Sequence, residues 1–172
     1  MTDDLKLALR AADKACALIK AGFERDFTTE HKADKSLVTS VDQQAEEVII
    51  QALRKGSPHA ILSEESGELP GSTGFRWVID PIDGTTNFAR HSTPFAVSIA
   101  LMAGDDSMAG VIRNPLTGEC YYAERGGGAF LDGRRIAVSG ESSPQKSIVF
   151  YNFGANPLHR QRIVHVVERL IY

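Results

Sequence analysis

Residues 77–88 read Trp-Val-Ile-Asp-Pro-Ile-Asp-Gly-Thr-Thr-Asn-Phe. The apolar run that opens this stretch is typical of a buried strand, and it ends on two carboxylates, Asp80 and Asp83. Pro81 stiffens the turn between them, and Gly84 follows with two hydroxyl residues. Because oxygen ligands are followed here by exposed backbone N–H groups, the stretch predicts a place that holds Mg²⁺ and a phosphate together.

Length and composition are those of an ordinary globular protein. The chain has 172 residues, with 42% hydrophobic and 24% charged residues, so we expect a single domain over residues 1–172. No apolar run reaches the roughly 18–20 residues of a membrane span, so we expect no membrane partner. A formal net charge of −3 without a basic run disfavours nucleic acid as the main ligand.

The N-terminus and the cysteines predict a cytoplasmic location. The acidic start of the chain leads into an amphipathic pattern, which is not that of a signal peptide. Cys16 and Cys120 have no CxxC partner, which favours buried, reduced thiols over a disulfide. The histidines show no zinc-type spacing, so surface or core roles are expected for them.

Apolar residues at steps of three and four predict a long first helix that ends near Phe23. A second helix is expected to begin near Ser40, because Ser40 and Gln43 are spaced as a capping box. The segment between these helices, residues 27–37, is polar and has no period, which indicates a loop.

After the second helix the period changes to that of strands. Asp132-Gly133 is a strong signal for a type I′ hairpin turn. A closing helix is expected over residues 158–170. The expected strands are residues 60–62, 75–79, 95–102, 107–113, 119–123, 129–131, 134–136 and 147–153. Two helices followed by a meander predict an α+β fold, with both helices packed on a mostly antiparallel sheet.

Acidic residues lie where the predicted elements begin or end, at positions from which a rigid scaffold can aim them: Asp42, Glu64, Glu65, Asp80 and Asp83. Carboxylate groups from two strand ends that converge on one crevice would supply the oxygen ligands that Mg²⁺ prefers. The Ile82 carbonyl, fixed by the proline turn, would add a neutral ligand.

The residues alone leave structural explanations open. Asp83-Gly84 is a common turn dipeptide, and Asp42 suits the first turn of a helix because of the helix dipole. Residues 63–66 have the composition of a helix N-cap region. The run of glycines at 126–128 precedes a strand, so we interpret it as a turn and not as a phosphate-binding loop.

Taken together, residues 80–88 resemble the signature of the inositol monophosphatase family, a group of Mg²⁺-dependent, lithium-sensitive phosphatases. Three further segments are similar to segments of that family, in the same order: residues 37–42, 62–67 and 126–133. The resemblance covers nearly the whole chain. It implies the N-terminal domain of the family's fold, a small phosphorylated metabolite as substrate, and a homodimer when the protein is full length.

The resemblance also implies a role for individual residues. The implied metal ligands, for two or three Mg²⁺ ions, are Glu64, Asp80, the Ile82 carbonyl and Asp83. The implied phosphate contacts are Ile82, Asp83, Gly84 and Thr85. The implied catalytic residues are Asp42, Thr85 and Glu64, with Asp42 and Thr85 orienting and deprotonating the attacking water. The reaction is then hydrolysis of a small phosphate monoester by a metal-activated water.

One departure from the family concerns the C-terminal side. The family's second half carries a further metal-binding Asp in a Trp-Asp motif and most contacts to the substrate's alcohol, whereas Trp77 is the only tryptophan here. We therefore expect the N-terminal metal-binding half, with the C-terminal half absent. The alternative is a family member that does not catalyse and acts as a regulatory or protein-binding module.

A weak hint on substrate comes from Lys32-Ala33-Asp34-Lys35-Ser36. It resembles a Lys-x-Asp-x-Ser variant found in members acting on histidinol phosphate or bisphosphonucleotides. A polar loop with solvated charges is the favoured explanation of this segment.

Overall fold

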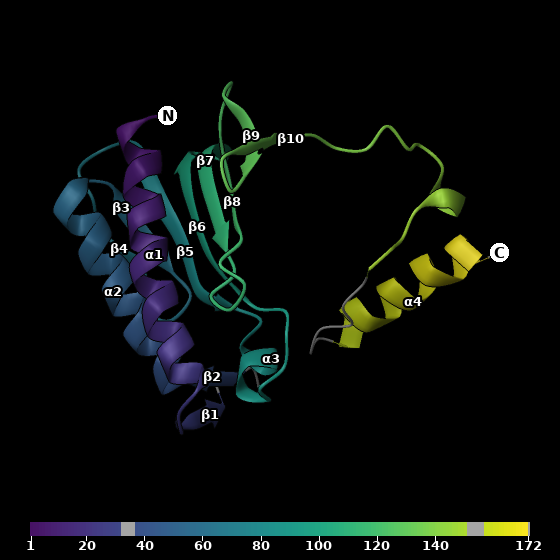
Figure 1. Cartoon of the computed structure of the whole chain (residues 1–172), viewed down its shortest axis with the longest axis horizontal. Coiled ribbons are helices and arrows are strands. Elements are labelled where there is room, and N and C mark those ends of the chain that lie inside the picture. Colours follow the sequence, from purple (N-terminus) through teal and green to yellow (C-terminus); the bar gives the residue numbers. More distant parts are fainter. Residues whose placement is uncertain (32–36, 151–156, 172) are drawn as a thin grey trace.

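Two helices cover one face of an eight-stranded sheet in the computed structural model, which describes residues 1–31, 37–150 and 157–171 (Figure 1). The helices are α1 (Asp3–Phe23) and α2 (Ser40–Gly56). The strands are β3 (Ala60–Ser63), β4 (Gly67–Leu69), β5 (Phe75–Asp83), β6 (Ala96–Ala103), β7 (Asp106–Arg113), β8 (Cys120–Glu124), β9 (Gly128–Leu131) and β10 (Arg134–Ile136). The predicted α+β architecture is confirmed.

The order of strands in the sheet is β10-β9-β8-β7-β6-β5-β3-β4. Neighbouring strands are antiparallel, as expected, except for β3 and β5, which run parallel. Parallel neighbours end at the same edge of a sheet, so the residues that follow β3 and those at the end of β5 lie together. The turn at Asp132-Gly133 has positive φ at both residues, as the type I′ prediction requires.

The core lies between the two helices and the sheet. The apolar faces of α1 and α2 pack against alternate residues of β5, β6 and β7. Trp77 in β5 is completely buried, and its Nε1–H donates to the Ser57 hydroxyl at 2.8 Å. This bond satisfies the polar atom of a large core side chain and ties β5 to the end of α2.

The start of α2 differs from the prediction by one residue. The N-cap is Thr39, not Ser40, and the capping box pairs Thr39 with Asp42. The expected loop before α2 also contains two short strands, β1 (Thr29–His31) and β2 (Leu37–Thr39), which pair antiparallel. Residues 32–36, with the substrate hint, lie outside the described residues.

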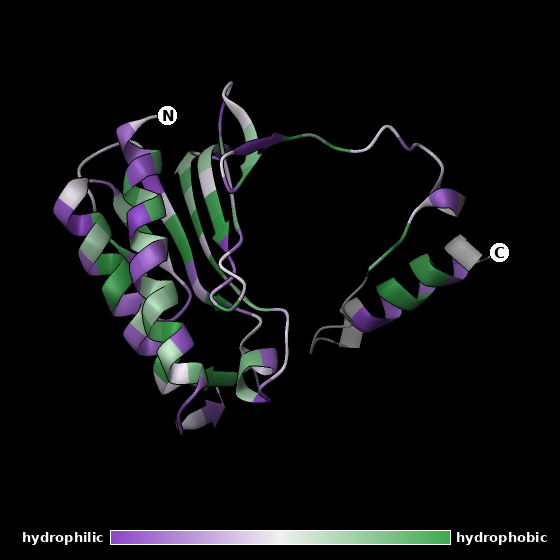
Figure 2. Cartoon of the chain, in the orientation of Figure 1, coloured by the Kyte–Doolittle hydropathy of each residue, from purple (hydrophilic) through white to green (hydrophobic). Residues whose placement is uncertain are grey.

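The C-terminal side departs further from the prediction. A strand was expected at residues 147–153, but residues 147–150 form none, and 151–153 lie outside the described part. A short 3-10 helix precedes them, and α4 (Pro157–Ile171) confirms the closing helix. In Figure 2, hydrophobic and hydrophilic residues alternate along the coloured part of α4, which lies apart from the sheet in Figure 1. In the described part of the chain, no helix combines the length and apolarity needed to cross a membrane.

Candidate metal and phosphate site

A β-bulge at the end of β5 brings its two aspartates to one face. Asp80 pairs with Ser98 and Asp83 with Ala96, so β5 has one residue more than β6 between these pairs. Side chains alternate along a strand, and an extra residue shifts that alternation by one. Pro81 and Ile82 are accordingly both buried, while both aspartates point away from the helices.

The Asp80 carboxylate is poorly compensated by its surroundings. Its Oδ1 atom is buried and, among the described atoms, has no hydrogen-bond partner. Burial, the nearby charges of Glu64 and Asp83, and a hydrogen bond with Glu64 together raise the pKa of Asp80 to about 7, and a hydrogen bond from the Ile82 backbone offsets part of that rise. A buried oxygen without a donor, next to two other acids, is the arrangement that a cation would relieve.

The predicted ligands are near one another without forming a closed set. Glu64 follows β3 and Asp83 ends β5, and both residues are exposed. Among the described residues, no three His, Cys, Asp or Glu side chains are gathered closely enough to hold a metal ion. The carboxylates therefore interact electrostatically around Asp80, and an ion would have to draw them together.

Asp42 and Thr85, predicted to activate water, are in direct contact. The Thr85 hydroxyl lies 3.0 Å from Asp42 Oδ1 and 2.9 Å from the Ile82 carbonyl oxygen. A hydroxyl has one proton, so it donates to only one of these acceptors at a time. The other carboxylate oxygen, Asp42 Oδ2, accepts from both the backbone N–H and the hydroxyl of Thr39.

Burial governs the acidity of Asp42. The residue is 1% exposed, and burial raises its pKa, while the hydrogen bonds from Thr39 and Thr85 lower it in part. A carboxylate with a raised pKa accepts a proton more readily than a solvated one does. Asp42 is thus a stronger base than a surface aspartate, and the Thr85 hydroxyl is close enough to donate a proton to it.

Gly84 shapes the turn between β5 and the short helix α3 (Thr85–Ala89). Its φ is +99°, and a Cβ there would lie 3.0 Å from the Pro94 carbonyl oxygen. Only glycine fits both the backbone conformation and the close approach. The turn delivers Asp83 and Thr85 on either side of Gly84, as predicted from the sequence, and the first N–H groups of α3 have no acceptor within that helix.

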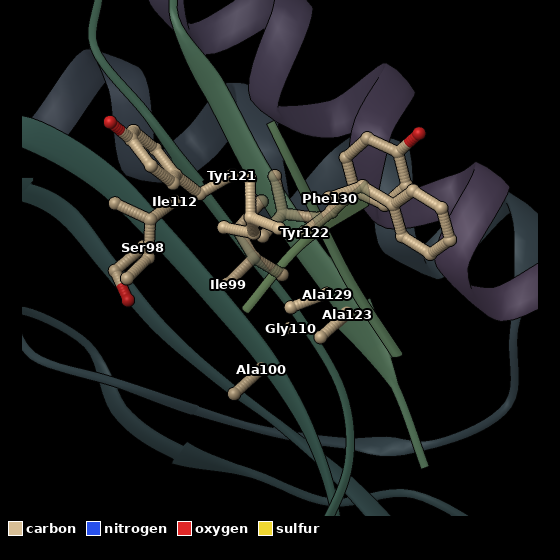
Figure 3. A pocket seen from close by; sticks show the side chains of 12 residues that line it. Ser98, Ile99, Ala100, Gly110, Ile112, Tyr121, Tyr122, Ala123, Ala129 and Phe130 are labelled. Atoms are coloured by element: carbon tan, nitrogen blue, oxygen red, sulfur yellow. The ribbon is translucent and has the colours of Figure 1, made fainter. Parts of the chain in front are cut away.

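Two hollows lie on the sheet face away from the helices. An apolar groove of about 280 Å³ crosses β6 to β9 and is lined by residues that include Ile112 and Tyr121 (Figure 3). It contains Ser98, the cross-strand neighbour of Asp80, but none of the predicted ligands. A second hollow of about 340 Å³ borders Asp83 and Gly84 directly and is more polar. The second hollow therefore offers space beside the candidate site.

Comparison with known proteins identifies the family. The model of the inositol monophosphatase family matches residues 1–170. The chain belongs to the inositol monophosphatase family. The α+β fold that the resemblance implied is shared with the IMPase of Thermotoga maritima, with a TM-score of 0.76 and 34% identity over 83% of this chain and 56% of that one.

Among curated proteins of known sequence, the chain is similar to members with different names. It is 45% identical to the Nus factor SuhB of Escherichia coli K12 over 139 residues, which cover 78% of this chain and 52% of that protein. It is 40% identical to a histidinol-phosphatase of Chlorobaculum parvum over 153 residues, or 88% of this chain and 59% of that protein. The chain thus spans about half the length of the first curated family members that it matches.

Sequence reasoning missed one buried acid beside the candidate site. Glu46, on α2, is 3% exposed and accepts hydrogen bonds from the turn that carries Glu64. The available signal was its position: it lies four residues after Asp42, within a buried helical stripe that is apolar except for these two acids. An acid in a core stripe requires hydrogen-bond partners, and here they come from the turn after β3.

Proposed function

We propose that the chain provides the metal-binding and water-activating part of a Mg²⁺-dependent phosphatase that hydrolyses a small phosphate monoester. The observation that carries the proposal is the environment of Asp80. Its Oδ1 is buried and finds no donor in the described part of the chain, and its neighbours Glu64 and Asp83 are also acids. Such a cluster is unfavourable by itself and becomes favourable when a divalent cation neutralises it.

The residues fit Mg²⁺. Carboxylates and a backbone carbonyl are hard oxygen donors, and a part-exposed site leaves room for the waters that Mg²⁺ retains. In the proposal the ligands are Glu64, Asp80, the Ile82 carbonyl and Asp83, shared between two or three ions. Bound Mg²⁺ would neutralise the charge of phosphate and leaving group.

Proton transfer falls to Asp42 and Thr85. When the Ile82 carbonyl serves as a ligand, Asp42 Oδ1 remains as the acceptor within 3.0 Å of the Thr85 hydroxyl. Thr85 then turns its lone pairs towards the attacking water, takes a proton from it, and passes its own proton to Asp42. The raised pKa of Asp42 makes it a suitable final acceptor.

Phosphate and substrate are assigned to the turn after β5. The backbone N–H groups of Gly84 and Thr85 donate to phosphate oxygens in this proposal, and the hollow beside Asp83 and Gly84 accommodates the alcohol. Inositol-phosphate-like compounds and related polyol phosphates are the proposed substrate class. A homodimer in the full-length protein, sensitivity to lithium and a cytoplasmic location complete the proposal.

Calorimetric titration of the chain with Mg²⁺ tests the central claim. We expect binding in the chain and its loss in Asp80→Asn, with phosphate release from a panel of monoesters depending on Mg²⁺ in the same way. The matched control is Asp105→Asn, an exposed acid in the turn between β6 and β7. Absence of binding by the unsubstituted chain at millimolar Mg²⁺ would contradict the proposal.

The second candidate is a regulatory or protein-binding role without catalysis. It is favoured by the 45% identity to a protein named Nus factor and by the exposed apolar groove between β6 and β9. The same titration separates the two functions, because a binding module has no need for the Asp80 cluster to take up Mg²⁺. A folded chain that ignores Mg²⁺ yet binds a protein partner would favour this role.

A further inference from the structure

Glu46 holds the turn that follows β3. Its Oε2 accepts the Ser63 hydroxyl and the backbone N–H of Glu65, the latter at 3.0 Å, and its Oε1 accepts the Ser66 hydroxyl. Glu64 lies within this turn, between two of the three donors. A buried carboxylate that gathers three donors from one short segment restricts the path of the backbone there.

The position of Glu46 on α2 relates it to Asp42. The two carboxylates are four residues apart, so they lie on the same face of the helix, one turn from each other. Asp42 contacts Thr85 in the segment after β5, whereas Glu46 contacts the segment after β3. Because β3 and β5 are parallel neighbours, one helix face binds both segments that carry the proposed metal ligands.

We propose that Glu46 is a positioning residue for metal binding: it fixes the turn at residues 63–66 so that Glu64 is presented to Asp80. The expected consequence, a higher affinity for Mg²⁺, rests on the proposed function. It does not make Glu46 a ligand, because its carboxylate oxygens are engaged by the turn.

The direct test of positioning requires no metal. In Glu46→Gln, one of the two acceptor oxygens is replaced by an NH₂ group, so hydrogen exchange at the Glu65 amide should accelerate at least tenfold. Amides in the centres of α2 and β5 should keep their protection, which shows that the fold persists. Ser66→Ala removes one donor from the exposed side of the turn, threatens the fold less, and should accelerate exchange in the same direction but less strongly.

The functional test is titration with Mg²⁺ alone. We expect Glu46→Gln to raise the dissociation constant about tenfold with unchanged stoichiometry. General structural damage would instead lower the stoichiometry at unchanged affinity. Glu47→Gln is the matched control, because Glu47 is the next residue of α2, is exposed, and accepts its side-chain hydrogen bond from Gln51 on the same helix.

The outcomes separate this inference from the proposed function. If the unsubstituted chain binds Mg²⁺ and folded Glu46→Gln binds it equally well, or if exchange at Glu65 is unchanged, the inference is overturned and the proposed function stands. If the unsubstituted chain binds no Mg²⁺, the proposed function fails, and with it the part of Glu46 in metal binding, whatever happens at Glu65.

Discussion

Asp42 and Asp80 are two aspartates of the candidate site with opposite surroundings. Both oxygens of Asp42 face hydroxyl or amide donors, from Thr39 on one side and Thr85 on the other. Asp80 has a buried oxygen that finds no donor among the described residues, and its charged neighbours are acids. Burial raises the pKa of both residues, but donors offset part of that rise at Asp42, whereas like charges add to it at Asp80.

The difference separates a carboxylate whose hydrogen bonds the chain supplies by itself, Asp42, from one whose charge a cation would have to compensate, Asp80. The Asp42–Thr85 contact is already formed, so proton transfer needs no rearrangement of these two groups. The scaffold holds the carboxylates around Asp80 close together despite their mutual repulsion, and a bound cation would relieve that repulsion. Substitutions on the two sides should therefore affect metal binding and turnover differently.

The largest effect is expected at Asp80. In Asp80→Asn, Mg²⁺-dependent phosphate release should fall by about a thousandfold, because several kcal/mol of charge stabilisation are lost and each ~1.4 kcal/mol is tenfold in rate. The free energy of unfolding of the metal-free chain should stay the same or rise, since repulsion with Glu64 and Asp83 is removed. Turnover assays and chemical denaturation measure both quantities. Turnover that survives in Asp80→Asn would remove the distinction between the two aspartates.

A smaller loss, confined to turnover, is expected at Thr85. Thr85→Ala removes the hydroxyl between Asp42 and the Ile82 carbonyl, so kcat should fall by about a hundredfold, a usual size for lost acid–base catalysis. Mg²⁺ affinity by calorimetry should change little, because Thr85 is not a proposed ligand.

The neighbouring, more exposed Thr86 provides the control, and Thr86→Ala should retain the kcat of the unsubstituted chain. A Thr85→Ala variant that lost Mg²⁺ affinity and kcat in equal measure would mean that the two halves of the site are not separable.

The fold was predictable where local pattern and tertiary environment agree. Apolar residues spaced three and four positions apart correctly located α1 and α2. The Asp132-Gly133 dipeptide correctly located the hairpin between β9 and β10. The strand at residues 147–153 was wrong over its described part, because an apolar run needs a partner to pair with. Ile148 and Phe150 are 84% and 91% exposed in the described structure.

The sequence singled out the candidate site residues but not the contacts that support them. The spacing of residues 80–85 predicts a metal and phosphate site, which stays a prediction, and the β-bulge explains how Asp80 and Asp83 share a face, which no spacing rule gives. The cap at Thr39 was placed one residue late because Ser40 offers the same chemistry. Glu46 was missed because its partners lie seventeen to twenty positions away in sequence and meet it only through the packing of α2 on β3.

The smallest effect expected is the contribution of Asp80 to the dependence of stability on pH. The folded chain holds the Asp80 proton up to about pH 7, whereas the unfolded chain releases it near the ordinary value of 3.8. The folded state therefore binds more protons between these values, and the free energy of unfolding of the metal-free chain falls as pH rises through that window. Since Asp80 is only partly buried, we expect a change of about 1–2 kcal/mol, well below the full linkage value.

Denaturation curves at pH 5 and pH 8 in the presence of a chelator measure this dependence. In Asp80→Asn this contribution should disappear, because no proton is left to titrate at that position. Saturating Mg²⁺ should reverse its sign, because metal binding requires the ionised carboxylate and so adds stability at the higher pH. The difference between the unsubstituted chain and Asp80→Asn isolates the contribution of Asp80 from that of the other acids. If this contribution raised the free energy of unfolding as the pH rises, the Asp80 carboxylate would be compensated by donors, as that of Asp42 is. The contrast between the two aspartates would then not hold.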